Sequence, residues 1–288
     1  LVPSNPGGGW DLTGRSIQHS LTSEKIIPVA MEVVNKAGGG GTIALADFTA
    51  RKDPYMMMVT GYAMVTSIMT NKSPFNFKNV TPLARLTAEH EVIAVSAKSK
   101  YRDFKEFIAD FKKNPKAITW GGGAAGSLDH AMVSMIAMAA GVDIKDVNYI
   151  AYSGGGETLP VVISNQVSVG VSGYAEFKPQ VDAGKVRFLA YSTEKRLPND
   201  PTPTIKESGL DVVVSNWRGI VGAPGLSAEN KAWLIELLTQ MRASKTWVDI
   251  CKKNGWADTF LTGDAFVKFI DQEMAVNEKV LKATGIVQ

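Results

Sequence analysis

The chain has 288 residues, of which 45% are hydrophobic and 20% are charged, and this balance excludes a disordered, fibrous or coiled-coil protein. A chain of this length accommodates two lobes more readily than one hydrophobic core. Lys and Arg number 31 against 28 Asp and Glu, and the resulting net charge of +3 is too small to predict a nucleic-acid partner.

Cysteine content and hydropathy exclude further classes of protein. Cys251 is the single cysteine, which rules out an internal disulfide and a cysteine-rich metal site. No apolar run approaches the roughly 18 residues that span a bilayer, and the longest, 135–142, is far shorter. The first residues, Leu1-Val2-Pro3, have the pattern of a strand whose beginning is missing. We therefore expect a processed or trimmed chain without its signal peptide.

Strand-like and helix-like patterns alternate along most of the sequence. Short apolar runs rich in branched residues predict strands at 27–34, 55–60, 93–97, 117–120, 147–152, 167–172 and 186–192. Apolar residues at spacings of three and four predict helices around 12–21, 104–111 and 128–140, and Gly141 stands where a helix C-cap belongs. This alternation predicts an α/β fold with mainly parallel sheets and helices on both faces.

Two stretches have the composition of boundaries between lobes. A polar Ser-Lys-Ser-Lys segment follows one predicted strand at about residue 97, and a second boundary lies near residue 215, before helices that continue to the end. We therefore expect two Rossmann-like α/β lobes, 1–98 plus 219–288 and 99–218. Two crossings between the lobes form a hinge, which lets rigid lobes close over a ligand in the cleft between them.

Four glycine-rich turns connect a predicted strand to a helix, at 6–11, 36–41, 121–127 and 153–157. Glycine allows positive φ angles and lets a ligand approach backbone amides. The following helix has unpaired N–H groups and partial positive charge at its start, so each turn is a potential anion site. Tight strand-to-helix turns also need glycine for purely structural reasons. Four such turns at the carboxyl ends of strands nevertheless favour a small anion, above all a carboxylate.

The turn at 121–127 also fits the pattern G-x-G-x-x-G, so a dinucleotide site is an alternative. That site needs an acidic residue at the end of the next strand to bind the ribose, but this strand ends Ala151-Tyr152-Ser153. A Walker A phosphate loop needs a lysine directly before Ser127, where the chain has Gly126. We therefore expect no cofactor.

The sequence holds few residues suited to catalysis or metal binding. The nearest match to G-x-S-x-G, at 170–174, lacks the last glycine. The histidines His19, His90 and His130 stand at no metal-ligand spacing, so no metal is expected. His130 lies in the first turn of its predicted helix, where it either donates to a ligand or caps the helix. The alternative function is an enzyme that uses His130 as acid or base on an anionic substrate, with only Glu157 as a nearby titratable group.

A series of motifs carries a resemblance to one family. The chain opens on Val2-Pro3-x-x-Pro6-Gly7-Gly8-Gly9-Trp10-Asp11, with Arg15 four residues on. There follow Asn35-Lys36-Ala37-Gly38-Gly39-Gly40-Gly41-Thr42, Gly123-Ala124-Ala125-Gly126-Ser127-x-x-His130, Tyr152-x-Gly154-Gly155-Gly156-Glu157, Ala183-Gly184-Lys185-Val186-Arg187 and Pro203-Thr204. Each motif alone is weak, but in this order they resemble the receptors of tripartite tricarboxylate transporters, the TctC or Bug family.

The resemblance implies a type II periplasmic binding protein, a periplasmic monomer of two α/β lobes that closes over its ligand. It implies that the protein has no enzymatic activity and delivers its ligand to integral membrane permease subunits. In the family, one carboxylate is held largely through backbone amides and ordered waters. Carried onto this chain, the corresponding positions are Gly7, Gly8, Gly9 and Asp11 in one lobe and Gly126, Ser127 and His130 in the other.

Two departures from the family pattern bear on the ligand. Ser4 and Asn5 stand where many relatives have an aromatic residue, which predicts a more polar pocket, and Trp10 replaces a small residue, as in the tricarboxylate-binding branch. We expect a citrate-like tricarboxylate or another polar di- or tricarboxylate. Asp11 either caps its helix or fixes the glycine loop from behind. The other predicted ligand contacts lie at strand ends and adjoining turns: Ser4, Asn5, Trp10, Thr60, Gly61, Tyr62, Ser153, Gly154, Gly155, Ser172, Gly173 and Tyr174.

Overall fold

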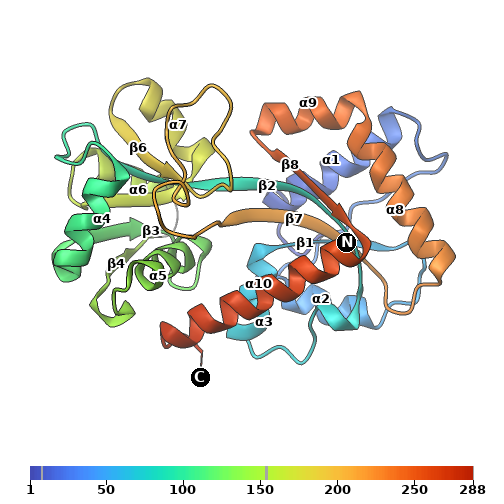
Figure 1. Cartoon of the computed structure of the whole chain (residues 1–288). Coiled ribbons are helices and arrows are strands. Elements are labelled where there is room, and N and C mark those ends of the chain that lie inside the picture. Colours follow the sequence, from blue (N-terminus) through green and yellow to red (C-terminus); the bar gives the residue numbers. More distant parts are fainter. Residues whose placement is uncertain (8, 153–154, 288) are drawn as a thin grey trace. The chain divides into compact units, whose positions relative to one another are not determined.

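Helices and strands alternate along the residues that the computed structural model describes, 1–7, 9–152 and 155–287 (Figure 1). The helices are α1 Gly9–Ser23, α2 Thr42–Thr49, α3 Tyr62–Thr70, α4 Phe104–Lys113, α5 Leu128–Ala140, α6 Gly155–Ile163, α7 Tyr174–Asp182, α8 Ala228–Ala243, α9 Lys245–Asn254 and α10 Gly263–Ala283. The strands are β1 Met57–Gly61, β2 Thr81–Ser96, β3 Thr119–Gly122, β4 Asn148–Ala151, β5 Val169–Gly173, β6 Val186–Tyr191, β7 Ser215–Gly222 and β8 Ala257–Thr262. The predicted α/β class is confirmed.

The chain folds into two compact units. Unit 1 consists of residues 1–88 and 217–278, and unit 2 of residues 89–216 and 279–288. The chain therefore passes between the units at three points, which lie inside β2, β7 and α10. The predicted lobe boundaries, after residues 98 and 218, stay a prediction.

Unit 1 is built on a sheet in which β1 pairs antiparallel with β7, and the first half of β2 pairs antiparallel with β8. Helices α1 and α8 each contribute one apolar face to its core. Ile17 and Leu21 of α1 stand four residues apart, so they share one face, and both are at most 1% exposed. Leu234 and Leu238 of α8 repeat this spacing in the same core cluster.

Unit 2 is built on β3, which pairs in parallel with β4 and β5, and on the second half of β2, which pairs antiparallel with β5 and β6. Helix α4 packs Phe107 and Phe111 edge-on against Trp120 of β3, with ring centroids 4.9 and 5.2 Å apart. Helix α5 has the predicted bounds and ends on Gly141 in the left-handed conformation, at φ 74°, so this predicted C-cap is confirmed.

Two expectations about strands are wrong. The sheets are not mainly parallel, because β2 is a single 16-residue strand that pairs antiparallel with β5, β6 and β8. Residues 27–34 form no strand. Pro28 has no backbone N–H to donate and Val29 is 67% exposed, so the run completes no ladder. Ile27, Met31 and Val33 nevertheless pack against the core of unit 1. A parallel bridge directly after this run joins Val2 to Asn35.

Candidate functional site

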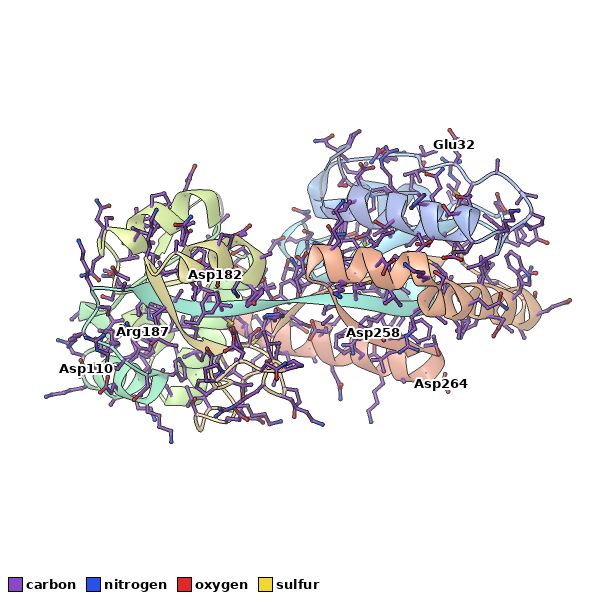
Figure 2. All side chains as sticks on the ribbon, turned by 90° about the horizontal axis from the view of Figure 1, so that it is seen from above. Glu32, Asp110, Asp182, Arg187, Asp258 and Asp264 are labelled. Carbon is purple, nitrogen blue, oxygen red and sulfur yellow. The ribbon has the colours of Figure 1, made fainter. Side chains whose placement is uncertain are left out.

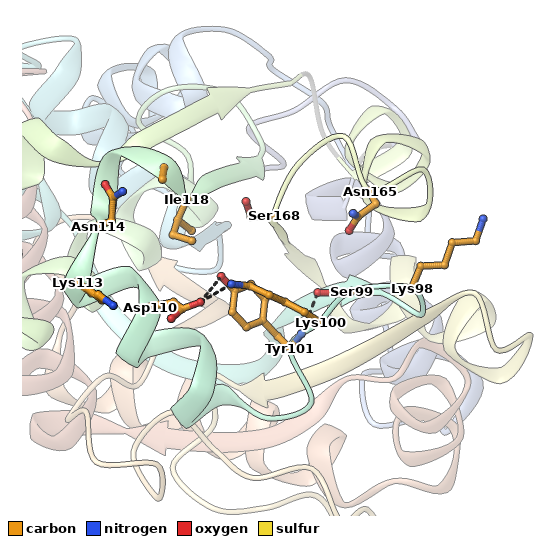
Figure 3. A pocket seen from close by; sticks show the side chains of 11 residues that line it. Lys98, Ser99, Lys100, Tyr101, Asp110, Lys113, Asn114, Ile118, Asn165 and Ser168 are labelled. Carbon is orange, nitrogen blue, oxygen red and sulfur yellow. Dashed lines mark hydrogen bonds and ion pairs between the residues drawn. The ribbon is translucent and has the colours of Figure 1, made fainter.

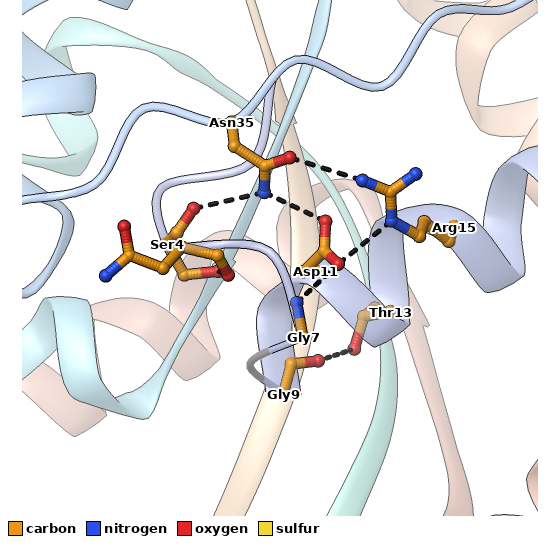
Figure 4. A network of polar contacts seen from close by, with 8 residues as sticks. Ser4, Gly7, Gly9, Asp11, Thr13, Arg15 and Asn35 are labelled. Carbon is orange, nitrogen blue, oxygen red and sulfur yellow. Dashed lines mark hydrogen bonds and ion pairs between the residues drawn. The ribbon is translucent and has the colours of Figure 1, made fainter.

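Asp11, in the first turn of α1, stabilises the glycine-rich turn of residues 6–11, called here the first glycine loop (Figure 4). Asp11 is 3% exposed, and its Oδ2 accepts hydrogen bonds from the Gly7 N–H at 2.8 Å and from Arg15 Nε at 2.9 Å. Its Oδ1 accepts one from Asn35 Nδ2 at 2.8 Å, and Asn35 also donates to the Ser4 carbonyl at 3.0 Å. Asp11 thus fixes the loop from behind, one of its two predicted roles, and the amide of Gly7 is already occupied.

The same contacts keep the Asp11 carboxylate ionised. The hydrogen bond from Arg15 and then that from Gly7 lower the pKa of Asp11 to about 2, although burial acts in the opposite direction. The charge of Arg15 offsets that of Asp11 at a distance of 2.9 Å. The start of α1 is therefore anchored by a carboxylate without carrying an uncompensated negative charge.

The indole of Trp10 packs against glycines from two other segments. A Cβ atom on Gly41 would lie 3.0 Å from Trp10 Cζ3, and one on Gly61 would lie 3.0 Å from Trp10 Nε1. The same Cβ on Gly61 would lie 2.5 Å from the backbone oxygen of Trp217. Gly61 has an ordinary extended φ of 174°, so close approach and not backbone conformation requires glycine there.

A buried arginine that the sequence reasoning missed lies against the first glycine loop. Arg218 of β7 is 8% exposed, and its Nη2 lies 2.8 Å from the point where a Cβ on Gly9 would stand. Its guanidinium lies 5.3 Å from the centroid of the Trp256 ring. Because Gly9 has no side chain, the guanidinium of Arg218 can lie against this loop. The available signal was a charged residue directly after Trp217, at the start of an apolar run.

Thr60 and Tyr62 face the interior of unit 1. Thr60 is 0% exposed, and its hydroxyl donates to the Met64 sulfur at 3.4 Å. Tyr62 is 3% exposed, and its hydroxyl donates to Oδ1 of Asn277. A ligand contact through either hydroxyl requires exchange of these bonds, so the predicted contacts of Thr60 and Tyr62 with the ligand stay a prediction.

The loop before α5 in unit 2 is ordered by its own residues and by Tyr149. Ser127 caps the helix, and its Oγ accepts from the backbone N–H of His130 at 3.4 Å. Gly126 has a φ of +82°, which favours glycine, and its N–H donates to Nδ1 of His130 at 3.1 Å. The His130 ring stacks on Tyr149 with centroids 4.5 Å apart. Tyr149 in turn donates to the Gly123 carbonyl at 2.7 Å.

These contacts determine which ring nitrogen of His130 carries the proton. Because Nδ1 accepts from Gly126, the neutral ring carries its hydrogen on Nε2. Burial lowers the pKa of His130, so the neutral form predominates at neutral pH. His130 therefore offers a ligand a neutral N–H donor, not a positive charge.

The turn from β5 to α7 holds three more predicted contacts. Ser172 is 3% exposed, and its hydroxyl donates to Oε2 of Glu176. A Cβ on Gly173 would meet no atom within 4 Å, so open space adjoins this glycine. The Tyr174 ring packs against His90, with centroids 4.7 Å apart.

The predicted ligand contacts are thus divided between the two units. Unit 1 holds Ser4, Asn5, Gly7, Gly9, Trp10, Asp11, Thr60, Gly61 and Tyr62. Unit 2 holds Gly126, Ser127, His130, Gly155, Ser172, Gly173 and Tyr174. Three further predicted contacts, Gly8, Ser153 and Gly154, lie outside the described residues.

A separate cavity of about 620 Å³ in unit 2 contains none of the predicted contacts (Figure 3). Its lining includes Lys100 and Lys113, and Lys100 forms an ion pair with Asp110 at 2.5 Å. Arg187, which Figure 2 labels, donates through Nη2 to the carbonyl of Tyr101 at 2.7 Å and so holds the loop at the edge of this cavity. The cavity is polar and independent of the glycine-rich turns.

Within residues 1–7, 9–152 and 155–287, no group of three or more His, Cys, Asp and Glu side chains has the arrangement of a metal site. No helix in those same ranges combines the length and the hydropathy needed to cross a bilayer.

Comparison with known proteins identifies the family. The model of the tripartite tricarboxylate transporter family receptor, TctC, matches residues 14–286. The chain belongs to this family. Protein BugT of Bordetella pertussis is 24% identical to this receptor over 293 residues, which cover 99% of this chain and 88% of BugT. The predicted resemblance is confirmed.

Solved structures share the fold of this receptor, which is that of type II periplasmic binding proteins. A TctC solute-binding protein from Polaromonas is similar with a TM-score of 0.88 and 24% identity, covering 98% of this chain and 96% of that one. Rpa4515 of R. palustris, solved with adipate, is similar with a TM-score of 0.73 and 23% identity, covering 100% and 97%. The family comprises solute-binding receptors, not enzymes, which removes the alternative of acid–base catalysis by His130.

Proposed function

We propose that this receptor binds a small polar di- or tricarboxylate, with citrate as the leading candidate, in the periplasm. It delivers the ligand as a monomer to the permease subunits of a tripartite tricarboxylate transporter. The observation that carries this proposal is the loop of Gly126, Ser127 and His130 at the start of the 13-residue helix α5. Helix N–H groups and the Nε2–H of His130 supply neutral donors for a carboxylate there.

Unit 1 supplies a second set of donors in this proposal. The loop before α1 is held by Asp11, and the guanidinium of Arg218 lies against Gly9 in the same loop. A di- or tricarboxylate has anionic groups for both sets, whereas a monocarboxylate satisfies only one. Because the second set binds only after the units close, closure of the units over the ligand follows from the difference in contacts.

A panel of carboxylates tests the ligand class. Isothermal calorimetry with citrate, malate, adipate and acetate is expected to give tight binding of at least one di- or tricarboxylate and none of acetate, because acetate lacks a second anionic group. Rpa4515 was solved with adipate, so adipate is the natural reference compound. Tight binding of acetate without binding of citrate would contradict the assignment.

Closure is tested by small-angle X-ray scattering with and without the ligand that binds best in this panel. We expect the radius of gyration to fall when the ligand is added, since closed units are more compact. The control is the same titration with acetate, which should leave the curve unchanged. An equal radius of gyration with and without a bound ligand would exclude capture by closure.

A further inference from the structure

The polar cavity of about 620 Å³ in unit 2 adjoins a segment with a local excess of positive charge (Figure 3). Residues 98–116, which supply most of its lining, contain seven Lys and Arg residues against three Asp and Glu residues. The whole chain has 31 against 28, so this one segment has a larger excess of positive charge than the entire sequence. The net positive charge of the chain is therefore concentrated beside this cavity.

The charged side chains of the cavity are only partly compensated by one another. Among the described residues of the lining they are Lys98, Lys100, Lys113 and Asp110. Asp110 forms an ion pair with Lys100 at 2.5 Å and accepts a hydrogen bond from the Tyr101 hydroxyl at 3.2 Å (Figure 3). Within the described part of the chain, no carboxylate forms an ion pair with Lys98 or Lys113. The lining thus has two more positive than negative side chains.

The loop of residues 98–101, which forms one edge of the cavity, is fixed by contacts with β6 and α4. Nη2 of Arg187 donates to the Tyr101 carbonyl at 2.7 Å and to the Ser99 carbonyl at 3.3 Å. Tyr101 is 5% exposed, and its ring packs edge-on against Phe107 with centroids 5.3 Å apart. The protein's own contacts therefore hold this edge in place, which lowers the entropic cost of binding a ligand there.

The size and the charge of the cavity fit a small phosphorylated compound. Sites for small molecules have volumes of roughly 300–1,000 Å³. Lysine binds phosphate as a point charge, and a phosphomonoester carries a charge of about −1.5 to −2 at neutral pH. That charge balances the two uncompensated ammonium groups, whereas a single carboxylate balances only one. Asn114, Asn165 and Ser168 also line the cavity, and their amides and hydroxyl suit hydroxyl groups of the esterified alcohol.

We propose that this cavity is a second anion site of the receptor, which binds the phosphomonoester of a hydroxylated compound. Lys98 and Lys113 bind the phosphate, and Asn114 and Asn165 form hydrogen bonds with the hydroxyl groups. A lipid headgroup with a terminal phosphate has the same chemistry as a free phosphomonoester, so the experiment includes both sources. None of the described lining residues is a predicted carboxylate contact, so this site is independent of the proposed function.

Isothermal calorimetry with glycerol 3-phosphate at low ionic strength tests the site. We expect binding of glycerol 3-phosphate that weakens as salt is added, and no binding of glycerol, because the main contacts are between charges. The double variant Lys98→Gln/Lys113→Gln is expected to bind about tenfold more weakly. The matched control, Lys105→Gln/Lys112→Gln, removes two positive charges from α4 outside the lining and is expected to change the affinity by less than about twofold.

Asp110→Asn is expected to change the affinity in the opposite direction. The substitution keeps the shape of the side chain but removes the negative charge that is paired with Lys100. Glycerol 3-phosphate is therefore expected to bind about threefold more tightly, whereas damage to the cavity would weaken binding. Thermal unfolding of each variant verifies that it is folded.

Cosedimentation with vesicles separates the two sources of the phosphate. Binding to phosphatidic acid vesicles but not to phosphatidylcholine vesicles, without binding of glycerol 3-phosphate, assigns the site to a lipid headgroup. Binding of glycerol 3-phosphate alone assigns it to a soluble ligand. Binding of neither probe overturns the site, as does binding that Lys98→Gln/Lys113→Gln leaves unchanged. Binding of an acidic peptide in place of both probes overturns the phosphate assignment. A receptor that binds glycerol 3-phosphate but no carboxylate retains this site and refutes the proposed function.

Discussion

Asp11→Ala is expected to weaken binding of adipate or citrate at least about tenfold and to lower the free energy of unfolding by about 2 kcal/mol. Asp11 accepts hydrogen bonds from Gly7, Asn35 and Arg15, and its loss leaves the first glycine loop without an anchor. Calorimetry measures the first effect, and urea unfolding measures the second. A variant that binds as tightly as the wild type would exclude this loop from the ligand site.

The pH dependence of the Asp11 effect has a definite sign. The pKa of Asp11 is lowered from 3.8 to about 2, so its contribution to stability is fully present above the ordinary carboxyl pKa. That contribution is lost as the pH falls through about 2. The difference in stability between wild type and Asp11→Ala should therefore be constant near neutral pH and shrink in strong acid.

Asp47→Ala is the matched control in the same unit. Asp47 forms ion pairs with Lys36 and Arg51, each at 2.9 Å, so it pairs with two cationic side chains where Asp11 pairs with one. Its side chain is 25% exposed, however, and none of its ion-pair partners lies in the first glycine loop. The expected loss of stability is at most about 1 kcal/mol, with unchanged affinity.

Gly61→Ala is expected to have the second large effect, a loss of about 1–3 kcal/mol in the free energy of unfolding. The new Cβ would stand 2.5 Å from the backbone oxygen of Trp217, and a backbone atom has less freedom to move than a side-chain end. It would also press on the Trp10 indole at 3.0 Å and so displace a predicted ligand contact. Thermal or urea unfolding measures the loss, and an unchanged midpoint would contradict the packing described for this strand.

Gly173→Ala is the control for Gly61→Ala, because both glycines are predicted ligand contacts at the junction of a strand and a helix. A Cβ on Gly173 meets no atom within 4 Å, and its φ of −60° suits alanine. We expect unchanged stability or a gain of up to about 1 kcal/mol. Weaker ligand binding without loss of stability would identify Gly173 as a point of close ligand approach.

Local sequence patterns predicted the parts of the site that depend on near neighbours. Asp11 reaches back four residues to Gly7, as one of its two predicted roles required, and α5 is capped by Ser127, three residues before His130, for which capping was the predicted alternative. Such contacts follow from helix geometry, because residues three or four apart lie together whatever the rest of the chain does. The same reasoning located Gly141 at the end of α5. It did not reveal that the hydroxyls of Thr60 and Tyr62 bind Met64 and Asn277 inside unit 1.

The sequence by itself determined the α/β class, the helix start that holds Ser127 and His130, and the family to which the chain belongs. Only the tertiary structure decided that β2 runs antiparallel to its neighbours and that Arg218 lies against Gly9. Tyr62 and Asn277 are hydrogen-bonded although they stand 215 positions apart. Such contacts depend on which strands pair and which helices cover them, and no periodicity along the chain encodes that choice. The charges near the predicted ligand loops are therefore a property of the fold, whereas the loops themselves can be recognised in the sequence.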